Sequence, residues 1–317
     1  MSVESDAPDL SVILPTDAYE TIQPVLEHLC RQTVANRLEI VLVAPASAAM
    51  TKARAHEGEF AAIRLVQIAS LSPLGAARAA GIRAATAPLI FVGETHSYLH
   101  PDAAEKLIAA AAAGPWASVT PGFANGNPTS LFSWAGFLAD YARWSAYLPA
   151  GEIPEAPLYN ALYHRDLLLS MGDRLEHMLT HGDELRMALQ ARGHRAYFEP
   201  AARIDHININ SLFESIHEHF LAGRLIGSQR VDRWSWFRRL AYALGAGLIP
   251  FVLVWRVLPG VRRTAQVESI PIATLPAILL LNVAKAAGEL VSYIAGRNLA
   301  QQAAMDDYEI HKLDYLA

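Results

Sequence analysis

The chain of 317 residues contains a single cysteine, Cys30, so an internal disulfide is excluded. It also lacks a long run of Lys or Arg, and its formal net charge of -5 provides no positive field to attract nucleic acid. Glu4 and Asp6 occupy the place where a secretory leader would carry basic residues. These absences favour a reducing, cytoplasmic setting without a nucleic-acid partner, and Cys30 is expected to be a buried thiol.

A glycine-rich dinucleotide motif is missing as well. No G-x-G-x-x-G segment follows the first predicted strand, which argues against a dinucleotide-dependent oxidoreductase. Hydrophobic residues make up 52% of the chain, enough for one large core or two modest ones. The apolar excess is concentrated after residue 236, so the two ends of the chain are expected to differ in character.

Strand and helix patterns alternate through the first 113 residues. Short β-branched and aliphatic runs predict strands, and apolar-periodic segments between them predict helices. The strands are expected at 10–14, 38–43, 63–68 and 89–92, and the helices at 21–32, 74–85 and 101–113. This alternation predicts an α/β fold with a mostly parallel central sheet flanked by helices. Its ligand should lie beyond the carboxyl ends of the strands, where the loops at 15–20, 44–47 and 93–96 converge.

The second half of the chain changes to helices alone. A strand at 116–121, helices at 129–148 and 183–192, and a short strand at 196–198 complete the predicted α/β part. From residue 212 the pattern is entirely helical. We therefore expect two domains, an α/β domain over residues 1–210 and an all-α region over residues 211–317.

Two apolar blocks in the helical region raise the question of a membrane. They cover residues 240–257 and 270–295, and each is marginal as a span because a bilayer needs about 20 apolar residues. Arginine and tryptophan residues precede the first block, and this mixture of side chains is typical of segments that lie in the headgroup layer of a membrane. The alternatives are an interfacial or hairpin anchor and a buried helical pair or homo-oligomer interface.

Six segments, in order, resemble motifs of the family 2 glycosyltransferases. The segments 11–16 (SVILPT), 74–82 (LGAARAAGI) and 88–96 (PLIFVGETH) are similar to the family's opening strand, its G-x-A-R-N-x-G helix and its D-x-D loop. Segments 159–166 (YNALYHRD), 182–185 (GDEL) and 200–206 (PAARIDH) resemble its acceptor loop, its E-D-x-D-L helix and its late histidine. The resemblance implies the GT-A nucleotide-diphospho-sugar transferase fold and transfer of a sugar from a nucleoside diphosphate donor to an acceptor, usually with inversion.

The resemblance assigns the donor site to the early strand ends. Pro15, Thr16 and Tyr19 match positions that contact the nucleoside, and Arg78 matches the arginine that neutralises the diphosphate. A guanidinium fork suits two phosphate oxygens. After the second strand the family usually carries Asp, whereas this chain has Ala44 and Pro45, so the identity of the base stays open.

The D-x-D position is occupied by Glu94, Thr95 and His96. The resemblance makes Glu94 and His96 ligands of a divalent cation, with His206 as a third ligand, and Glu94 also belongs to the nucleotide-sugar site. Imidazole suits Mn²⁺ better than Mg²⁺, which prefers oxygen ligands. The alternative is a site that has lost its metal and keeps Glu94 and His96 as hydrogen-bonding residues.

Inverting transfer also needs a carboxylate that deprotonates the acceptor hydroxyl. The family's catalytic acid falls on Gly182, so the neighbouring Asp183 and Glu184 are the candidates for the base. Tyr159 and Asn160 match the loop that binds the acceptor.

The sequence thus predicts an inverting glycosyltransferase on the cytoplasmic face of the membrane, using Mn²⁺ or Mg²⁺. A membrane-associated tail would suit a glycan or lipid-linked acceptor in cell envelope polysaccharide synthesis. If the tail is buried, the enzyme would be cytoplasmic. The rival interpretation is a catalytically impaired protein that keeps the fold as a binding or assembly module, because the motifs depart from the family at Ala44, Thr95 and Gly182.

Overall fold

The computed structural model describes residues 7–45, 48–180, 182–231 and 234–317. Its contacts divide the chain into two compact units. The first consists of residues up to Gly122 together with Pro149–Asp205, and the second of Phe123–Leu148 together with His206–Ala317. The sequence placed one boundary after residue 210. In the structure this boundary lies after Asp205. In addition, the segment Phe123–Leu148 from the middle of the chain belongs to the second unit.

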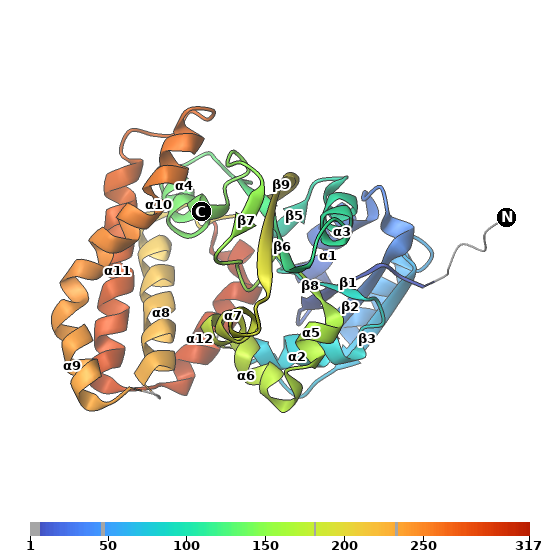
Figure 1. Cartoon of the computed structure of the whole chain (residues 1–317), viewed down its shortest axis with the longest axis horizontal. Coiled ribbons are helices and arrows are strands. Elements are labelled where there is room, and N and C mark those ends of the chain that lie inside the picture. Colours follow the sequence, from blue (N-terminus) through green and yellow to red (C-terminus); the bar gives the residue numbers. More distant parts are fainter. Residues whose placement is uncertain (1–6, 46–47, 181, 232–233) are drawn as a thin grey trace. The chain divides into compact units, whose positions relative to one another are not determined.

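A mixed sheet forms the centre of the first unit (Figure 1). In the described residues it has nine strands, in the order β3-β2-β1-β4-β8-β6-β9-β5, with β7 paired to β9. Strands β3, β2, β1 and β4 are parallel, whereas β8 runs antiparallel to both β4 and β6. The bounds are β1 Leu10–Pro15, β2 Leu38–Ala44, β3 Ala62–Gln67, β4 Leu89–Val92, β5 Ser97–Leu99, β6 Trp116–Asn125, β7 Gly151–Ile153, β8 Leu162–His164 and β9 Arg195–His206.

Helices cover both faces of the parallel strands, which explains why β1, β2 and β4 are buried along their whole length (Figure 1). One face packs against α2, α5, α6 and α7 through Ile13, Val41 and their neighbours. Helices α1 and α3 lie on the other face. The bounds are α1 Tyr19–Cys30, η1 Ala35–Arg37, η2 Ala48–His56, α2 Leu74–Ala84, α3 Ala103–Ala112, α5 Arg165–Leu169, η4 Gly172–Arg174, α6 Leu175–Thr180 and α7 Gly182–Ala191.

The register brings the carboxyl ends of the parallel strands to one edge. Ile13 of β1 is paired with Val92 of β4, and Pro15 of β1 is paired with Val43 of β2. The loops that follow β1, β2 and β4 therefore start side by side, as the alternating pattern predicts.

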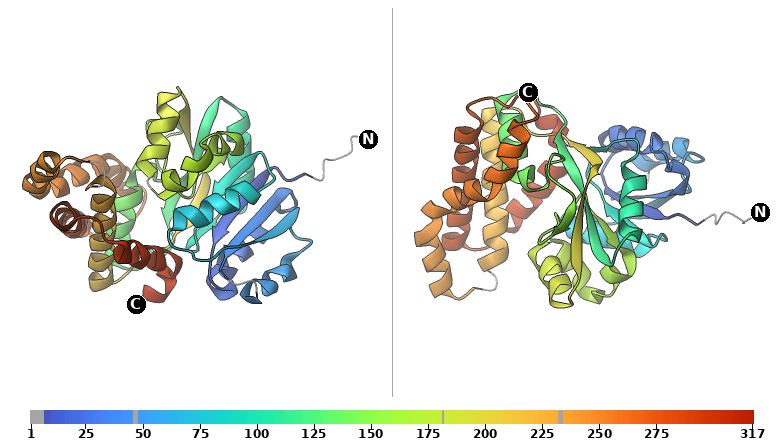
Figure 2. Two further views of the ribbon diagram at one scale, coloured as in Figure 1. Left: turned by 90° about the horizontal axis from the view of Figure 1, so that it is seen from below. Right: turned by 45° about the horizontal axis from the view of Figure 1, so that its top comes forward.

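The second unit is helical. Its longest helices, α8 and α11, run side by side (Figures 1 and 2). Gly223 and Gly288 allow this approach, because a Cβ at either position would overlap the backbone of the facing helix. The bounds are α4 Leu131–Tyr141, η3 Ala142–Trp144, α8 Leu212–Val231, α9 Trp236–Gly245, η5 Ala246–Leu248, α10 Ile249–Ala265, α11 Thr274–Ala295, α12 Leu299–Ile310 and η6 Lys312–Tyr315.

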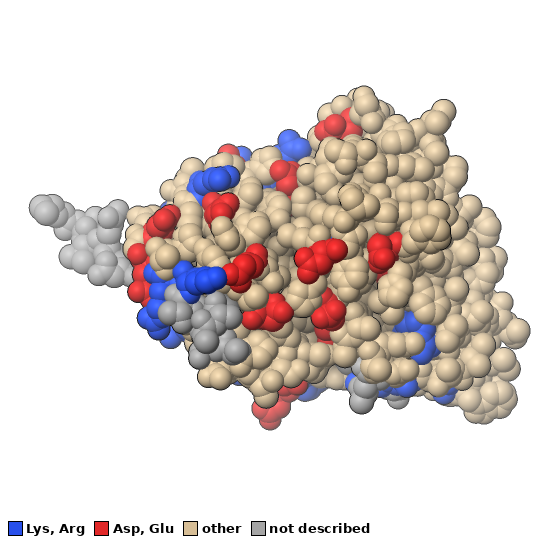
Figure 3. All heavy atoms as spheres, turned by 180° about the vertical axis from the view of Figure 1, so that it is seen from behind, with Lys and Arg blue, Asp and Glu red and all other residues tan. Residues whose placement is uncertain are grey.

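Two helical stretches of the second unit are long and apolar enough to cross a membrane, Trp236–Ala265 and Thr274–Ala295. They differ in burial: 17% of the apolar window of the first is buried, against 50% for the second. Figure 3 shows a broad area of the second unit with few charged side chains and with Lys and Arg near its lower edge.

Charged side chains are also buried inside the second unit. Lys312 of η6 lies 2.9 Å from the carboxylate of Glu218 on α8, and both side chains are almost fully buried. Lys285 of α11 lies 3.1 Å from Asp140 of α4. Lys285 interrupts the apolar pattern of α11, and this partner explains why it is tolerated there.

Candidate functional site

The predicted site begins where β1 and β4 end. Thr16 is fully buried. Its backbone N–H donates to the Val43 carbonyl at 3.0 Å, and its side-chain hydroxyl donates to the Ala18 carbonyl at 2.9 Å. The N–H of Gly93 donates to the Ile13 carbonyl at 3.0 Å, so the loop that carries Glu94 leaves β4 beside the end of β1.

Arg78 lies on α2 and is buried, with 3% of its surface exposed. Its guanidinium carbon lies 3.4 Å from the centre of the Tyr159 ring, a cation–π contact. Within the described part of the chain, the buried Nε and Nη1 atoms of Arg78 have no hydrogen-bond partner. A buried guanidinium that keeps two donors unused suits an anionic ligand, because a buried charge without a partner is costly.

Tyr159 and Asn160, the two predicted acceptor residues, connect Arg78 to Glu94. Tyr159 stacks on Arg78 and donates its hydroxyl to the Leu179 carbonyl at 3.2 Å. Asn160 is buried in a left-handed backbone conformation, φ 52°. Its amide donates to a carboxylate oxygen of Glu94 at 2.5 Å and to the Ser97 hydroxyl at 2.9 Å. Arg78, Tyr159, Asn160 and Glu94 thus form a continuous chain of contacts.

Glu94 and His96 lie close together. Both are buried, and Nε2 of His96 lies 3.7 Å from the Glu94 carboxylate. The Ser97 hydroxyl donates to the same carboxylate at 3.3 Å, which fixes its orientation. Carboxylate and imidazole together are a donor set that fits a divalent transition metal such as Mn²⁺.

His206, the third predicted ligand, is the last residue of β9 and is counted with the second unit. Its Nδ1 lies 2.8 Å from the side-chain oxygen of Asn208, and its ring lies 4.3 Å from that of Tyr141. Burial, reinforced by the charge of Lys312, lowers the pKa of His206 to about 3. The imidazole is therefore neutral at pH 7, the form that can bind a metal.

The two candidate bases have different surroundings at the start of α7. Glu184 is nearly buried, and its carboxylate lies 2.7 Å from Nε2 of His177 and 3.8 Å from Arg174. The Asp183 side chain is 70% exposed and lies 3.3 Å from Arg186. Both acids thus have a basic neighbour, and they differ in exposure: the Asp183 side chain is open to solvent, whereas that of Glu184 is nearly buried.

Packing of α2 against α6 places these acids in the same region as Arg78. Gly75, in the first turn of α2, approaches Thr180 at the end of α6 so closely that a Cβ would overlap Thr180. Since α7 begins two residues after Thr180, the start of α7 lies near the turn of α2 that carries Arg78.

Three residues near the site escaped sequence reasoning. Ser97 supports both Glu94 and Asn160, and its position three residues after Glu94 was the available signal. His56 lies 3.0 Å from the hydroxyl of Tyr19, a residue predicted to contact the nucleoside. Cys30, expected to be a buried thiol, is only partly buried and lies 3.4 Å from the other side of the His56 ring.

Comparison with known proteins adds to this geometry. The family model described as glycosyl transferase family 2 matches residues 11–170. The mannosyltransferase PcManGT from Pyrobaculum calidifontis, solved with GDP-Man and Mn²⁺, is similar at 16% identity over 95% of this chain and 88% of that chain, with a TM-score of 0.51. Residues 1–349 of TarS from S. aureus, solved with UDP, are 15% identical over 91% of this chain and 92% of that chain, with a TM-score of 0.47. No curated protein matches the chain.

Proposed function

Because the chain belongs to glycosyl transferase family 2, we propose that this glycosyltransferase takes its sugar from a nucleoside diphosphate donor and inverts the anomeric carbon. The family and the similarity to PcManGT also confirm the expected GT-A fold. The observation that carries the proposal is the buried Arg78 guanidinium, which lies over the Tyr159 ring and has two nitrogen atoms without a hydrogen-bond partner in the described part of the chain. A diphosphate is an anion of the right charge and shape for that fork.

In the proposed reaction, Arg78 binds the diphosphate and stabilises the charge that grows on it as the glycosidic bond breaks. Pro15, Thr16 and Tyr19 line the nucleoside side of the site. Tyr159 positions the guanidinium, and the neighbouring Asn160 reaches toward the acceptor side while it holds Glu94 in place. Fixed donors of this kind stabilise a leaving group without reorganising during the reaction.

Glu94 and His96 are the proposed ligands of a divalent cation, with His206 as the third ligand. The Asp205 carboxylate, one residue before His206, lies 3.1 Å from His100, four residues after His96, which supports this assignment. When bound, the cation acts as a Lewis acid on the diphosphate oxygens. The imidazole donors favour Mn²⁺ over Mg²⁺. PcManGT is likewise solved with Mn²⁺ and a nucleotide sugar.

We assign the general base to the acidic pair at the start of α7, with Asp183 as the first choice. Its carboxylate removes the proton from the acceptor hydroxyl, the oxygen attacks the anomeric carbon, and the nucleoside diphosphate leaves. Glu184 is already engaged by His177 and Arg174, so its carboxylate serves better to position this turn.

The test measures donor turnover with Mn²⁺ in wild type, Arg78→Ala and a matched control, Arg83→Ala. Arg83 lies on the same helix, but its side chain is exposed. We expect Arg78→Ala to lower kcat/KM by about 100-fold or more, the usual loss when a stabilising donor is removed, and Arg83→Ala to leave it unchanged. Equal rates in the two variants would contradict the assignment of Arg78.

A binding or assembly module remains the second candidate, because the family's catalytic acid is replaced by Gly182. Calorimetry with nucleoside diphosphates establishes binding, and donor turnover then separates the two functions. An enzyme should bind the donor and turn it over, with turnover that falls in Glu94→Gln and Asp183→Asn. A module should bind it with the same background turnover in wild type and both variants.

The second unit supports a location at the membrane. Helices α9 and α10 expose large apolar side chains, among them Leu244 (81%), Trp255 (73%) and Phe251 (62%). Arginines accompany them: the Arg238 guanidinium carbon lies 4.4 Å from the Trp234 ring centre. Apolar side chains with aromatic and cationic neighbours suit the surface of an anionic bilayer. We therefore propose that the enzyme acts on the cytoplasmic face of a membrane, with a lipid-linked or envelope glycan as its acceptor.

A further inference from the structure

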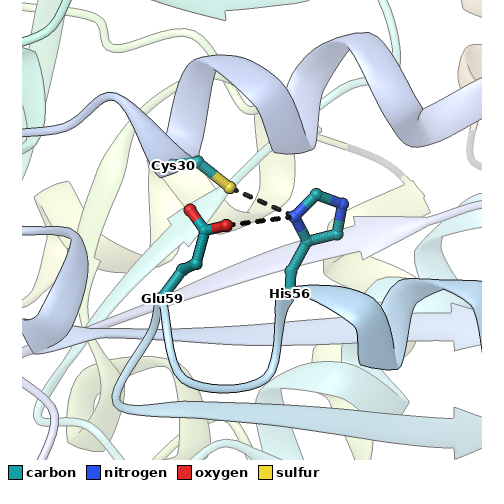
Figure 4. Close-up of side chains that lie close together, drawn as sticks. All are labelled: Cys30, His56 and Glu59. Atoms are coloured by element: carbon teal, nitrogen blue, oxygen red, sulfur yellow. Dashed lines mark hydrogen bonds and ion pairs between the residues drawn. The ribbon is translucent and has the colours of Figure 1, made fainter.

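Three potential metal ligands meet outside the proposed donor site. Cys30 is the last residue of α1, His56 is the last residue of η2, and Glu59 lies in the turn that follows η2 (Figure 4). The Cys30 sulfur lies 3.4 Å and a Glu59 carboxylate oxygen 4.0 Å from Nδ1 of His56. All three ligand atoms lie within 4.8 Å of one another. We propose that Cys30, His56 and Glu59 form a binding site for Zn²⁺.

The geometry agrees with tetrahedral zinc. Zn–S bonds of about 2.3 Å and Zn–N bonds of about 2.0 Å, at a tetrahedral angle, place sulfur and nitrogen about 3.5 Å apart. The observed separation of 3.4 Å matches this value. The Glu59 carboxylate must move closer to His56, and it is 53% exposed at a turn, so nothing buried has to rearrange.

The His56 ring is oriented for this role. Its Nδ1 faces Cys30 and Glu59, while its Nε2 lies 3.0 Å from the hydroxyl of Tyr19. With Nδ1 bound to the ion, Nε2 carries the proton and donates it to the Tyr19 oxygen. Metal-binding histidines usually have such a partner on the second nitrogen, because it fixes the tautomer and the ring.

The charges also balance. Zinc binds cysteine as the thiolate, so the thiol proton of Cys30 has to leave on binding. Binding of Zn²⁺ displaces that proton into solvent and forms the Zn–S bond. Thiolate and carboxylate together then neutralise the ion. A sulfur donor selects zinc over the Mn²⁺ proposed for Glu94 and His96.

If the proposed function holds, zinc at this site should also affect nucleotide binding at the donor site. Tyr19 hydrogen-bonds to His56 and is the first residue of α1, directly after the loop proposed to contact the nucleoside. Zinc would therefore fix Tyr19 and make nucleotide affinity depend on zinc. Zinc binding itself is measured without donor or acceptor, so its failure is distinct from failure of the proposed function.

The single cysteine makes the test direct, because any thiolate-to-cobalt charge-transfer absorption must come from Cys30. The full chain is stripped with chelator and titrated with Co²⁺, then with Zn²⁺. Glu94 and His96 can also bind Co²⁺, so the titration follows only the charge-transfer band. We expect the band to saturate with Co²⁺, to disappear when Zn²⁺ displaces the cobalt, and to be absent in Cys30→Ser. Tyr19→Phe should weaken Zn²⁺ binding by about 10- to 100-fold.

Matched variants separate this site from simple attachment of metal to a thiol. His56→Gln and Glu59→Gln should reduce the Co²⁺ affinity that the charge-transfer band reports, whereas His28→Gln on α1 should not. Glu59 lies in an exposed turn, so Glu59→Gln should fold normally and still measure the contribution of a ligand to Co²⁺ affinity, even if His56→Gln folds poorly. An absent band in wild type, or a band that both ligand variants retain at full affinity, would overturn the proposal.

Discussion

The two units differ in how much of their large apolar side chains they expose to the surface. In the first unit, β1 and β2 are buried, and Glu39 is a rare buried charge among their apolar side chains. In the second unit, Lys312 and Glu218 are buried, while Trp255 and Phe251 are more than half exposed. A protein surrounded by water normally resembles the first unit. The second unit resembles it less, and this difference is the basis for the proposed contact with a membrane.

This difference weakens the case for two membrane spans and favours a surface anchor. Helix α11 packs against α8, and its buried side chains include Asn282, Glu289 and Ser292. Polar side chains of this kind are costly and uncommon in a helix that spans a membrane. Helices α9 and α10 instead carry their apolar side chains outward and have few buried ones. They fit an interfacial position, with α11 as their support.

The largest effect on stability should come from breaking the buried ion pair of the second unit. Lys312→Met leaves the Glu218 carboxylate buried without its ammonium partner at 2.9 Å. Removal of one member of a buried pair typically costs 3–5 kcal/mol, and we expect a loss of about 3 kcal/mol in the free energy of unfolding. Urea denaturation at pH 7 measures it.

An ion pair of the first unit supplies the control. Lys52 and Glu20 lie 2.5 Å apart, but both side chains are about two thirds exposed. Lys52→Met should therefore leave the free energy of unfolding unchanged within error. A double variant, Glu218→Gln with Lys312→Met, should recover part of the loss. Equal losses for Lys312→Met and Lys52→Met would remove the contrast between the units.

A smaller effect is expected at Glu39, the buried carboxylate of the first unit. It accepts hydrogen bonds from the Ser11 hydroxyl at 2.5 Å, the Thr86 N–H at 2.7 Å and Arg64 at 3.0 Å. Burial alone would raise the pKa of Glu39, but these bonds outweigh it and hold the pKa below its ordinary value. Glu39→Gln should cost about 2 kcal/mol at pH 7, the usual range for hydrogen bonds to a charged group.

The pH dependence of that loss follows from the lowered pKa. The stabilising contribution of Glu39 is present above the ordinary carboxyl pKa of 4.5 and is lost as pH falls through the lower folded value. The difference between wild type and Glu39→Gln should therefore shrink below pH 4.5. Glu105→Gln, at an exposed position of α3, should show no comparable difference at any pH. A constant difference from pH 7 to pH 3 would contradict this account.

The first unit was predictable because its signals are local. The β-branched run at Leu10–Leu14 and the alternating helices identify a parallel sheet, in which the ends of β1 and β4 lie side by side just before Thr16 and Glu94. β9 was underestimated: the sequence indicated a strand over 196–198, but it spans twelve residues. Glu199, Pro200 and Arg203 interrupt its apolar pattern, and pairing within the sheet overrides that local signal.

Other features depend on contacts that no local pattern encodes. The segment Phe123–Leu148 joins the second unit because α4 packs on α11, although it lies between parts of the first unit in the sequence. Cys30 meets His56 across 26 residues, and the stretch around His56 has no strong periodicity. The role of Asp183 or Glu184 as base stays a prediction, since the motif position itself is Gly182.

The smallest effect on stability should come from the exposed aromatics of α10, although these should matter most for membrane binding. Phe251→Gln with Trp255→Gln removes apolar groups that already face outward, so the free energy of unfolding should change by no more than about 0.5 kcal/mol. Binding to phosphatidylglycerol vesicles, measured by cosedimentation, should weaken at least about tenfold, because each buried aromatic contributes about 1.5–3 kcal/mol. Met187→Gln, at a half-exposed position of the first unit, should alter neither quantity. Unchanged vesicle binding, together with a dimer that the double variant dissociates, would instead make this face a contact between two copies of the chain.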